Sequence, residues 1–419
     1  MRNKVPLLQS RLSHAAKQSL NRKFGALYDK IYRSDVLWTA WKQVRSNRGA
    51  PGIDDVSIDY VKEVVGEVEF LKEIQSELHA RTYRPQAVKR CWIDKPGKPE
   101  KRPLGIPVLK DRVVQMATKL VIEPIFETNF LPCSYGFRPG RSTHDAIDEI
   151  RRKITFEERC VVIDADIKGY FQNIDHALLL NLVRRRISDP RVLALIKGWL
   201  KSGVMDRGTF EATEDTGTPQ GGVISPLLAN IYLHSFDKMF LLSGIRGTLV
   251  RYADDLVILL KEGGARVLER VRGMLGRLGL ELHRDKTRIA DARRGFDFLG
   301  VHFRLCPVTK KGSRLRESCR LWPSDTSFSR IKAKICERIG RRYSLSLEEM
   351  IAELNPIIRG WNNYHTRIPS SGRKRLRKLN GFVRERLRIF LKRKHNISTR
   401  GSRRLRNNVL VELGLYQFG

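Results

Sequence analysis

The pattern of apolar and polar positions divides the chain into a helical beginning, a mixed middle and a helical end. Over residues 1–48, apolar side chains such as Leu27, Ile31 and Trp41 recur near helical spacing. The glycine and proline cluster at 49–52 predicts the end of that unit. The beginning of the chain is therefore expected to be helical.

The rest of the pattern alternates between helical and extended periods, which indicates an α+β fold. The expected elements are an amphipathic helix at 61–80, short strands around a flexible loop within 83–107, a helix at 111–126, a buried strand at 161–163, a helical segment at 176–201, a turn at 219–222 leading into a helix from about 226, a hairpin at 249–260, and basic helices from about 329 onward. No apolar run approaches the roughly 18 residues of a membrane span, so no membrane partner is expected.

The charge of the chain predicts a polyanionic partner. Lys and Arg number 80 against 45 Asp and Glu, a formal net charge of +35, which is most easily tolerated beside nucleic acid. Residues 371–408 hold 15 Lys or Arg and one acid, Glu385, and so contribute +14. Residues 1–28 add six basic residues and no acid. This basic arm fits nucleic-acid binding, with an organelle transit peptide as the alternative.

The six cysteines form no CxxC pair, which excludes a zinc ribbon or a dense disulfide scaffold as the expected organisation. Reduced, packed cysteines fit an intracellular protein.

Candidate chemistry begins with paired carboxylates that follow apolar β-formers. Asp254 and Asp255 lie at the tip of the predicted hairpin, and Asp164 and Asp166 follow the buried run at 161–163. Adjacent carboxylates repel each other, and burial disfavours their charge, so a divalent cation would relieve both penalties. Two strands ending in carboxylates can hold two Mg²⁺ about 4 Å apart for phosphoryl transfer. A surface turn and a helix cap are the alternative readings.

Six ordered motifs resemble those of a known family. They are Arg102–Pro107, Gly136–Ser142, Asp166–Phe171, Gly217–Pro226, Tyr252–Asp255 and Pro356–His365. Together they resemble a group II intron-encoded reverse transcriptase and maturase, over most of the chain. The nearest likeness is to the compact bacterial members that lack an endonuclease.

The resemblance implies roles at the catalytic centre. Asp166, Asp254 and Asp255 match the metal ligands, with the backbone carbonyl of Ile167 as a further ligand, although Asp255 is open to a tuning role. The implied cofactors are two Mg²⁺ ions, with Mn²⁺ as a possible substitute. Asp164 precedes the motif and is expected to be mainly structural. Lys286 resembles a lysine proposed as general acid for pyrophosphate, and a solvated lysine is an equal alternative.

The resemblance also implies a nucleotide site. Lys95 and Arg102 match cations that grip the triphosphate, although Lys98 or Lys101 are alternatives to Lys95. Phe171 matches the aromatic that excludes a ribose 2′-hydroxyl, with Tyr170 as the other candidate.

Two further positions complete the comparison with this family. Gln220 matches a residue near the nascent base pair. Gln172 departs from the aspartate usual in the family, which puts in doubt any ion pair made there.

The basic C-terminal region is expected to bind RNA phosphates. The residues assigned to this role are Arg373, Lys374, Arg375, Arg377, Lys378, Lys392, Arg393 and Lys394. Trp361, Tyr364 and His365 are either base-stacking groups or core, and core is favoured for Trp361.

The expected fold is a right-hand polymerase with a ferredoxin-like antiparallel palm. The expected domains are an N-terminal extension at 1–60, fingers at 61–160, the palm at 161–305, a helical thumb or maturase region at 306–400 and a short tail at 401–419.

The function expected from this resemblance is RNA-directed DNA synthesis, together with binding of the parental intron RNA to assist splicing and retrohoming. The expected partners are that RNA, an RNA template with a DNA primer, dNTPs and target DNA. The alternatives are a splicing cofactor with secondary polymerase activity, or a reverse transcriptase recruited to defence or repair.

The chain ends soon after Tyr416 and shows no Cys-pair plus His-Asn nuclease pattern, so target cleavage is expected to be absent and the primer to come from elsewhere. A bacterial cytoplasmic location, at the nucleoid during mobility, is favoured over an organelle.

Overall fold

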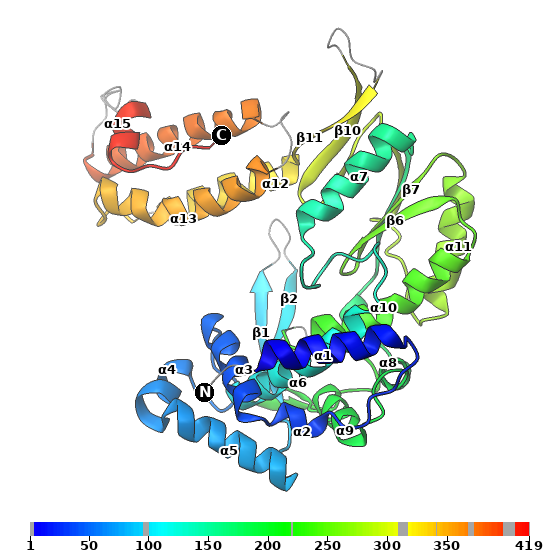
Figure 1. Ribbon diagram of the computed structural model, residues 1–419. Coiled ribbons are helices and arrows are strands. Elements are labelled where there is room, and N and C mark those ends of the chain that lie inside the picture. Colours follow the sequence, from blue (N-terminus) through cyan, green and yellow to red (C-terminus); the bar gives the residue numbers. More distant parts are fainter. Residues whose placement is uncertain are drawn as a thin grey trace. The chain divides into compact units, whose positions relative to one another are not determined.

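The computed structural model describes residues 4–94, 100–218, 221–308, 317–340, 342–367, 373–396 and 407–418 of the chain (Figure 1). The chain divides into two compact units. The first comprises Met1–Ser142, Ala165–Leu256 and Ala265–Thr287, and the second comprises Thr143–Asp164, Val257–Gly264 and Arg288–Gly419. None of the helices in these described stretches is both long and apolar enough to cross a lipid bilayer.

Helices make up most of the first unit. They are α1 (Val5–Gln18), α2 (Tyr28–Ile31), α3 (Ser34–Ser46), α4 (Ile58–Tyr60) with the π-helical turn Val61–Val65, α5 (Glu67–Ala80), α6 (Leu109–Glu127), α8 (His176–Arg184), α9 (Pro190–Leu200), α10 (Ser225–Leu242) and α11 (Gly264–Gly276). Helix α6 is buried over most of its length, including the polar side chains of Asp111, Arg112 and Gln115, and packs against α1 and α3. The core of this unit is therefore built around α6.

The sequence predicts a single helical segment at 176–201, but the structure has two helices there. The carboxylate of Asp189 caps α9 by accepting from the backbone N–H of Arg191, and Pro190 occupies the first helical turn. Because proline lacks an N–H and favours the start of a helix, α9 must begin anew at this position. Asp189 also accepts from the N–H groups of Leu27 and Tyr28, which holds the N-terminal segment.

Three sheets accompany the helices. In the first unit β1 (Val88–Asp94) pairs antiparallel with β2 (Lys101–Ile106) and parallel with β4 (Val204–Asp206), which pairs with β5 (Thr209–Glu211). A second sheet has the order β6 (Gly247–Tyr252), β7 (Asp255–Leu260), β3 (Val161–Asp166), β8 (Arg288–Asp291), and the unit boundary passes through its strands. The expected strands at 83–107 and the hairpin at 249–260 are confirmed. The fold is α+β with mixed and antiparallel sheets.

The second unit joins a small sheet to a helical bundle. Strands β9 (Phe296–Phe298), β10 (Val301–Pro307) and β11 (Glu317–Pro323) form an antiparallel sheet, beside α7 (Thr143–Glu157). The sequence reading did not anticipate α7 or the β10–β11 pair. Phe296 stacks on Phe303 with ring centroids 5.0 Å apart, which packs this sheet.

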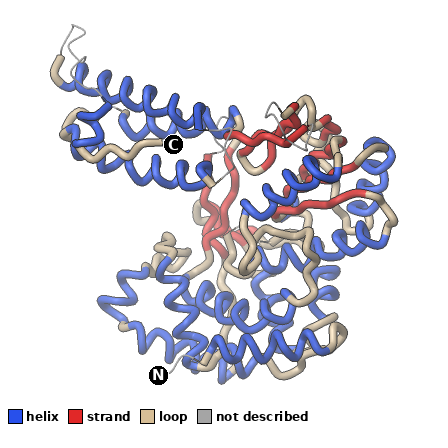
Figure 2. The backbone as a smooth tube through the Cα atoms, turned by 45° about the horizontal axis from the view of Figure 1, so that its top comes forward, coloured by secondary structure: helices blue, strands red, loops and turns tan. Residues whose placement is uncertain are grey.

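The C-terminal bundle consists of α12 (Asp325–Ile339), α13 (Leu347–Thr366), α14 (Arg373–Lys394) and the short α15 (Asn407–Glu412). Figure 2 draws the described residues of this part as helices and loops, with no strand among them. Apolar residues at helical spacing on α12, α13 and α14 form one core cluster. Ser346 and Glu349 form a capping box that starts α13. The basic helices expected from about residue 329 are confirmed.

Candidate active site

Asp166 lies at the end of strand β3, where the segment at 281–287 runs alongside the chain. The N–H of His283 donates to the carbonyl of Asp166 at 2.7 Å, and Ile167 forms an antiparallel bridge with Leu282. This pairing brings the ammonium of Lys286 into contact with the Asp166 carboxylate. Asp166 and Lys286 are both predicted as site residues from the sequence. They are 120 positions apart in the chain but adjacent in the structure.

Asp254 lies in the two-residue loop between β6 and β7. Ala253 precedes it with φ of +57°, a left-handed conformation that costs a non-glycine residue about 1 kcal/mol or more. Asp254 is half-buried at this loop, whereas Asp255 begins β7 and is exposed. The tight loop therefore presents Asp254 and Asp255 in different environments.

The charges around Asp254 bring four predicted residues into one electrostatic neighbourhood. Burial raises the pKa of the Asp254 carboxyl, and the like charge of Asp166 raises that pKa further. Arg102 on β2 and Lys286 oppose this increase, because their positive charges favour the ionised form. Four separate chain segments thus converge within electrostatic range.

The donor set suits a hard divalent cation. Asp166, Asp254, Asp255 and the carbonyl of Ile167 offer only oxygen, which Mg²⁺ prefers. A cation would also relieve the like-charge and burial penalties on Asp254. In the described part of the chain, no three His, Cys, Asp or Glu side chains converge closely enough to hold a metal, and the Asp166 carboxylate contacts Lys286 instead. The residues fit a metal by their chemistry.

The hairpin that carries Asp254 is anchored by a buried arginine that sequence reasoning missed. Arg251, two residues before Ala253, is 0% exposed and donates to the carboxylate of Asp237 on α10 at 2.7 and 2.8 Å. The same guanidinium donates to the carbonyl of Ala253 and to the Asn230 side chain, both at 3.0 Å. The available signal was a single cation within an otherwise apolar strand before two aspartates.

A glycine lets a second segment approach the same hairpin. A Cβ added to Gly136 would lie 2.3 Å from the backbone nitrogen of Ala253, closer than real contacts allow. Asn230 donates to the Gly136 carbonyl at 2.8 Å, and Tyr135 and Arg251 are joined by a backbone hydrogen bond of 2.8 Å. The Gly136–Ser142 motif therefore contributes the surface on which the aspartate loop rests.

Two neighbouring aromatics separate into core and site positions. Tyr170 is 2% exposed, and its hydroxyl donates to the carbonyl of Ala229 at 2.6 Å. Phe171 is half-buried, with its ring centroid 5.3 Å from that of Tyr170. Because Tyr170 is already enclosed, Phe171 is the aromatic of this pair that retains an accessible face.

Other predicted positions lie elsewhere. Lys95 and Gln220 fall outside the described residues. Asp164 pairs with Arg288 on β8 at 3.1 Å within the second unit. Gln172 is exposed, and Gly221 lies so close to β2 that a Cβ would be 2.5 Å from the carbonyl of Gly105.

The basic residues predicted to bind RNA lie on α14 in two kinds of environment. Arg377, Lys378 and Arg393 are exposed. Arg375 pairs with Asp325 at 2.9 Å, and Lys394 donates to the carbonyl of Leu345 at 2.6 Å. Lys392 is half-buried, and the side chains of Arg373 and Lys374 lie outside the described set.

The aromatic stretch on α13 is part of the bundle. The indole of Trp361 donates to Ser327 at 3.2 Å, and its ring lies 4.1 Å from that of His365 and 5.6 Å from that of Phe418. The Tyr364 hydroxyl donates to the carbonyl of Leu299 at 2.7 Å. The preference for a core role of Trp361 is confirmed.

Comparison with known proteins gives two family matches. The family described as "Reverse transcriptase (RNA-dependent DNA polymerase)" matches residues 93–303, half of the chain, and the family described as "Group II intron, maturase-specific domain" matches residues 328–408. The first match includes Asp166, Asp254 and Lys286, and the second includes the bundle from α12 to α14.

The chain is also similar to individual proteins. Group II intron-encoded protein LtrA of Lactococcus lactis subsp. cremoris is 40% identical over 233 residues, which are 55% of this chain and 38% of that protein. Protein YkfC of Escherichia coli (strain K12) is 37% identical over 334 residues, which are 70% of this chain and 86% of that protein. The chain thus spans well under half of LtrA and most of YkfC. By its two domains and these similarities, the chain belongs to the group II intron-encoded reverse transcriptases and maturases.

Proposed function

We propose that this protein synthesises DNA on an RNA template. The observation that carries the proposal is the electrostatic coupling of Asp166 with Asp254, flanked by Arg102 and Lys286. Paired carboxylates with nearby cations suit a reaction in which a primer 3′-hydroxyl attacks the α-phosphate of a dNTP and pyrophosphate leaves. Membership of the reverse transcriptase family supports the same reaction.

The architecture proposed for this activity is a right-hand polymerase. Residues 1–60 would form an N-terminal extension, 61–160 the fingers, 161–305 a ferredoxin-like palm, 306–400 the thumb or maturase region, and 401–419 a short tail. The four-stranded sheet that carries Asp166 at the end of β3 and Asp255 at the start of β7 supports the palm assignment. The helical bundle with its own core supports the thumb assignment.

Two Mg²⁺ ions, or Mn²⁺ in their place, would be held by Asp166, Asp254, Asp255 and the carbonyl of Ile167. When bound, such ions stabilise the charge that develops on the attacking and leaving oxygens. Burial of Asp254 and the like charge of Asp166 both raise the pKa of the Asp254 carboxyl, which supports a cation here because a cation would favour the ionised form.

The surrounding side chains would orient the nucleotide and the departing pyrophosphate. Arg102 would hold the triphosphate together with Lys95, since negative charge must be neutralised there as pyrophosphate leaves. Lys286 would give a proton to pyrophosphate, and Gln220 would contact the nascent base pair. Phe171 would lie against the sugar and select deoxynucleotides, which its accessible face supports.

Primer extension on an RNA template with Mg²⁺ and dNTPs tests the catalytic proposal. Wild-type protein is expected to extend the primer, and Asp254→Ala to lose about a hundred- to a thousandfold in rate, as expected when a group stabilising the transition state is removed. Asp59→Ala, an exposed aspartate on α4, is the matched control and should keep its rate. An active Asp254→Ala protein would refute the assignment.

A second proposed activity is binding of the parental group II intron RNA to assist splicing and retrohoming. The maturase-specific domain and the exposed cations of α14 support it. Target DNA, the template RNA and the primer would be further partners, in a bacterial cytoplasmic setting. Asp254→Ala separates the two activities, because binding does not need that carboxylate. Splicing should persist while DNA synthesis is lost, and loss of both would contradict this division.

A further inference from the structure

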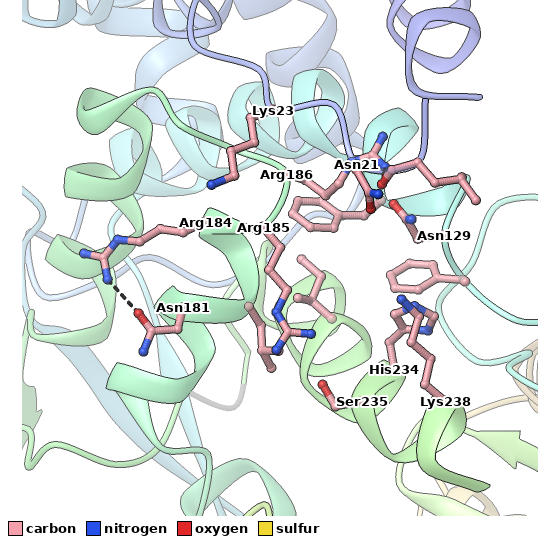
Figure 3. A pocket seen from close by; sticks show the side chains of 15 residues that line it. Asn21, Lys23, Asn129, Asn181, Arg184, Arg185, Arg186, His234, Ser235 and Lys238 are labelled. Carbon is pink, nitrogen blue, oxygen red and sulfur yellow. Dashed lines mark hydrogen bonds between the residues drawn. The ribbon is translucent and has the colours of Figure 1, made fainter. Parts of the chain in front are cut away.

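A basic pocket in the first unit lies outside the catalytic residues described above. Figure 3 shows it between the segment after α1, the end of α6, the end of α8 and the middle of α10. Its volume is about 420 Å³, within the range of pockets that hold small molecules or single nucleotides. All four walls belong to one unit, so the pocket is a property of that unit alone.

The pocket has an excess of positive charge. Lys23, Arg184, Arg185, Arg186 and Lys238 line it, and none of the 15 lining residues in the described part of the chain is acidic. Arg186 is held in place by donating to the carbonyls of Leu20 and Ala16. Within the described residues, the side chains of Arg185 and Lys238 have no hydrogen-bond or ion-pair partner. Mutual repulsion of these cations favours an anion between them.

One wall of the pocket combines aromatic surface with unused hydrogen-bonding groups. The rings of Phe130 and His234 meet edge to face with centroids 5.7 Å apart. Both ring nitrogens of His234 and Oδ1 of Asn129 are buried and have no partner among the described residues. Leaving such groups unsatisfied costs roughly 1–3 kcal/mol each, so a ligand that pairs with them gains affinity.

The state of His234 defines the kind of partner that it can accept. Burial, followed by the charges of Lys238 and other cations, lowers the pKa of His234 to about 3. The ring is therefore neutral near pH 7, with one donor and one acceptor nitrogen. Together with the Asn129 carbonyl oxygen, this pattern matches the mixed donor and acceptor edge of a nucleobase, whereas a phosphodiester group carries no O–H to donate to an acceptor nitrogen.

We propose that this pocket binds one nucleotide unit, with its phosphate between Arg185 and Lys238 and its base against Phe130, His234 and Asn129. The unit is either part of a single-stranded RNA chain or a free mononucleotide, since both carry the same phosphate and base. The RNA form deepens the RNA-binding function proposed above and rests on it. Phe130 is 8% exposed and the Arg138 guanidinium lies over its ring at 5.3 Å, so the base contacts only the uncovered rim of this ring.

Cross-linking of the wild-type protein tests the location directly. A short oligouridylate carrying 4-thiouridine is irradiated with the full-length protein, and cross-linked peptides are identified by mass spectrometry. RNA as the ligand predicts cross-links at Phe130 or His234, reduced at least about tenfold by unlabelled oligouridylate. A free mononucleotide predicts instead that 8-azido-AMP labels these residues and that AMP protects them. Labelling of neither residue by either probe overturns the proposal.

Two variants test the same point through affinity for the probe that labels the pocket. Ser235→Trp fills the pocket without changing charge, and Arg185→Glu reverses one of its cations. Each should weaken binding by about tenfold. Arg266→Glu on α11, an exposed position outside the pocket, makes the same charge change and should alter affinity less than about twofold. Equal losses in Arg185→Glu and Arg266→Glu, with none in Ser235→Trp, would assign the effect to overall charge and overturn the pocket.

Primer extension by the wild-type protein separates this proposal from the previous one. Failure to extend a primer would contradict the proposed polymerase activity. Labelling of the pocket would still test the nucleotide site independently. Extension without pocket labelling would defeat the pocket alone.

Discussion

Arg251 and Asp237 form an ion pair in which both side chains are completely buried, with N–O distances of 2.7 and 2.8 Å. The same arginine holds the carbonyl of Ala253, the residue with the left-handed backbone beside Asp254. A fully buried pair is costly to break, because removing one partner leaves the other charge uncompensated. The pair therefore links the stability of the sheet that contains β6 to the position of the loop that carries Asp254.

Arg251→Met should lower the free energy of unfolding by roughly 3–5 kcal/mol, because Asp237 is left buried without its partner. The double variant Arg251→Met with Asp237→Leu should regain most of that stability. It should not regain the primer-extension rate, since the Ala253 carbonyl has still lost its donor. Urea unfolding and primer extension measure the two quantities. A stable and fully active double variant would mean that the pair has no part in positioning the loop.

Gly136→Ala should displace the hairpin that carries Asp254, because the new methyl group would meet the backbone nitrogen of Ala253 at 2.3 Å. We expect a loss of at least about tenfold in the extension rate, since misplacement of catalytic groups by about 1 Å costs as much or more. Gly273→Ala is the matched control in α11, where no atom lies within 4 Å of the added Cβ. That change should stabilise the helix by about 0.5–1 kcal/mol and leave the rate unaltered. Equal rates for the two variants would argue against contact at the hairpin.

Phe171→Ala should raise the incorporation of rNTPs relative to dNTPs, if the aromatic face excludes a 2′-hydroxyl. Tyr170→Phe is the control, because Tyr170 is buried and loses only its hydrogen bond to Ala229, worth about 1 kcal/mol. Steady-state extension with each nucleotide set gives the ratio. An unchanged ratio in Phe171→Ala would remove the residue from the selectivity mechanism.

Arg377→Gln combined with Lys378→Gln should weaken RNA binding and reduce its dependence on salt. Both residues are exposed on α14. Each lost phosphate contact lowers the slope of log affinity against log salt by about 0.7–0.9. The pair Lys62→Gln and Lys72→Gln, on the first unit, removes the same charge from other exposed positions. Filter binding at several salt concentrations measures the slope, and equal effects of both pairs would indicate a general charge effect.

His365 should make the C-terminal bundle less stable in acid. Burial lowers the pKa of His365 to about 4, from about 6.5 in an unfolded chain. Between these values the unfolded chain binds more protons than the folded one, so stability falls as pH drops from 6.5 to 4. The full effect is about 3 kcal/mol, from 1.36 kcal/mol per pKa unit.

Thermal unfolding of the wild-type protein and of His365→Gln, measured across this pH range, tests the prediction. The variant loses the contact with Ser327 at 3.1 Å, but its stability should fall less steeply in acid. Parallel curves for the two proteins would assign the acid sensitivity to other groups.

The sequence alone was sufficient for many of the local elements, although not for α7 or the β10–β11 pair, and it named the candidate catalytic groups. Periodicity predicted α6, the hairpin around Asp254 and the basic bundle helices, because each pattern repeats over many residues. The order of the short motifs indicated the family. The division of 176–201 into two helices was missed, although Asp189 and Pro190 carry a start signal in the sequence.

Only the tertiary structure decided which groups act together. The contact of Lys286 with Asp166, the anchoring of Ala253 by Arg251, and the approach of Gly136 to the same loop join residues far apart in the chain. The separation of Tyr170 from Phe171, and the pocket around His234, likewise depend on what other segments cover. Periodicity reports only which side of an element is apolar, whereas burial, charge coupling and steric approach depend on elements that the chain brings together when it folds.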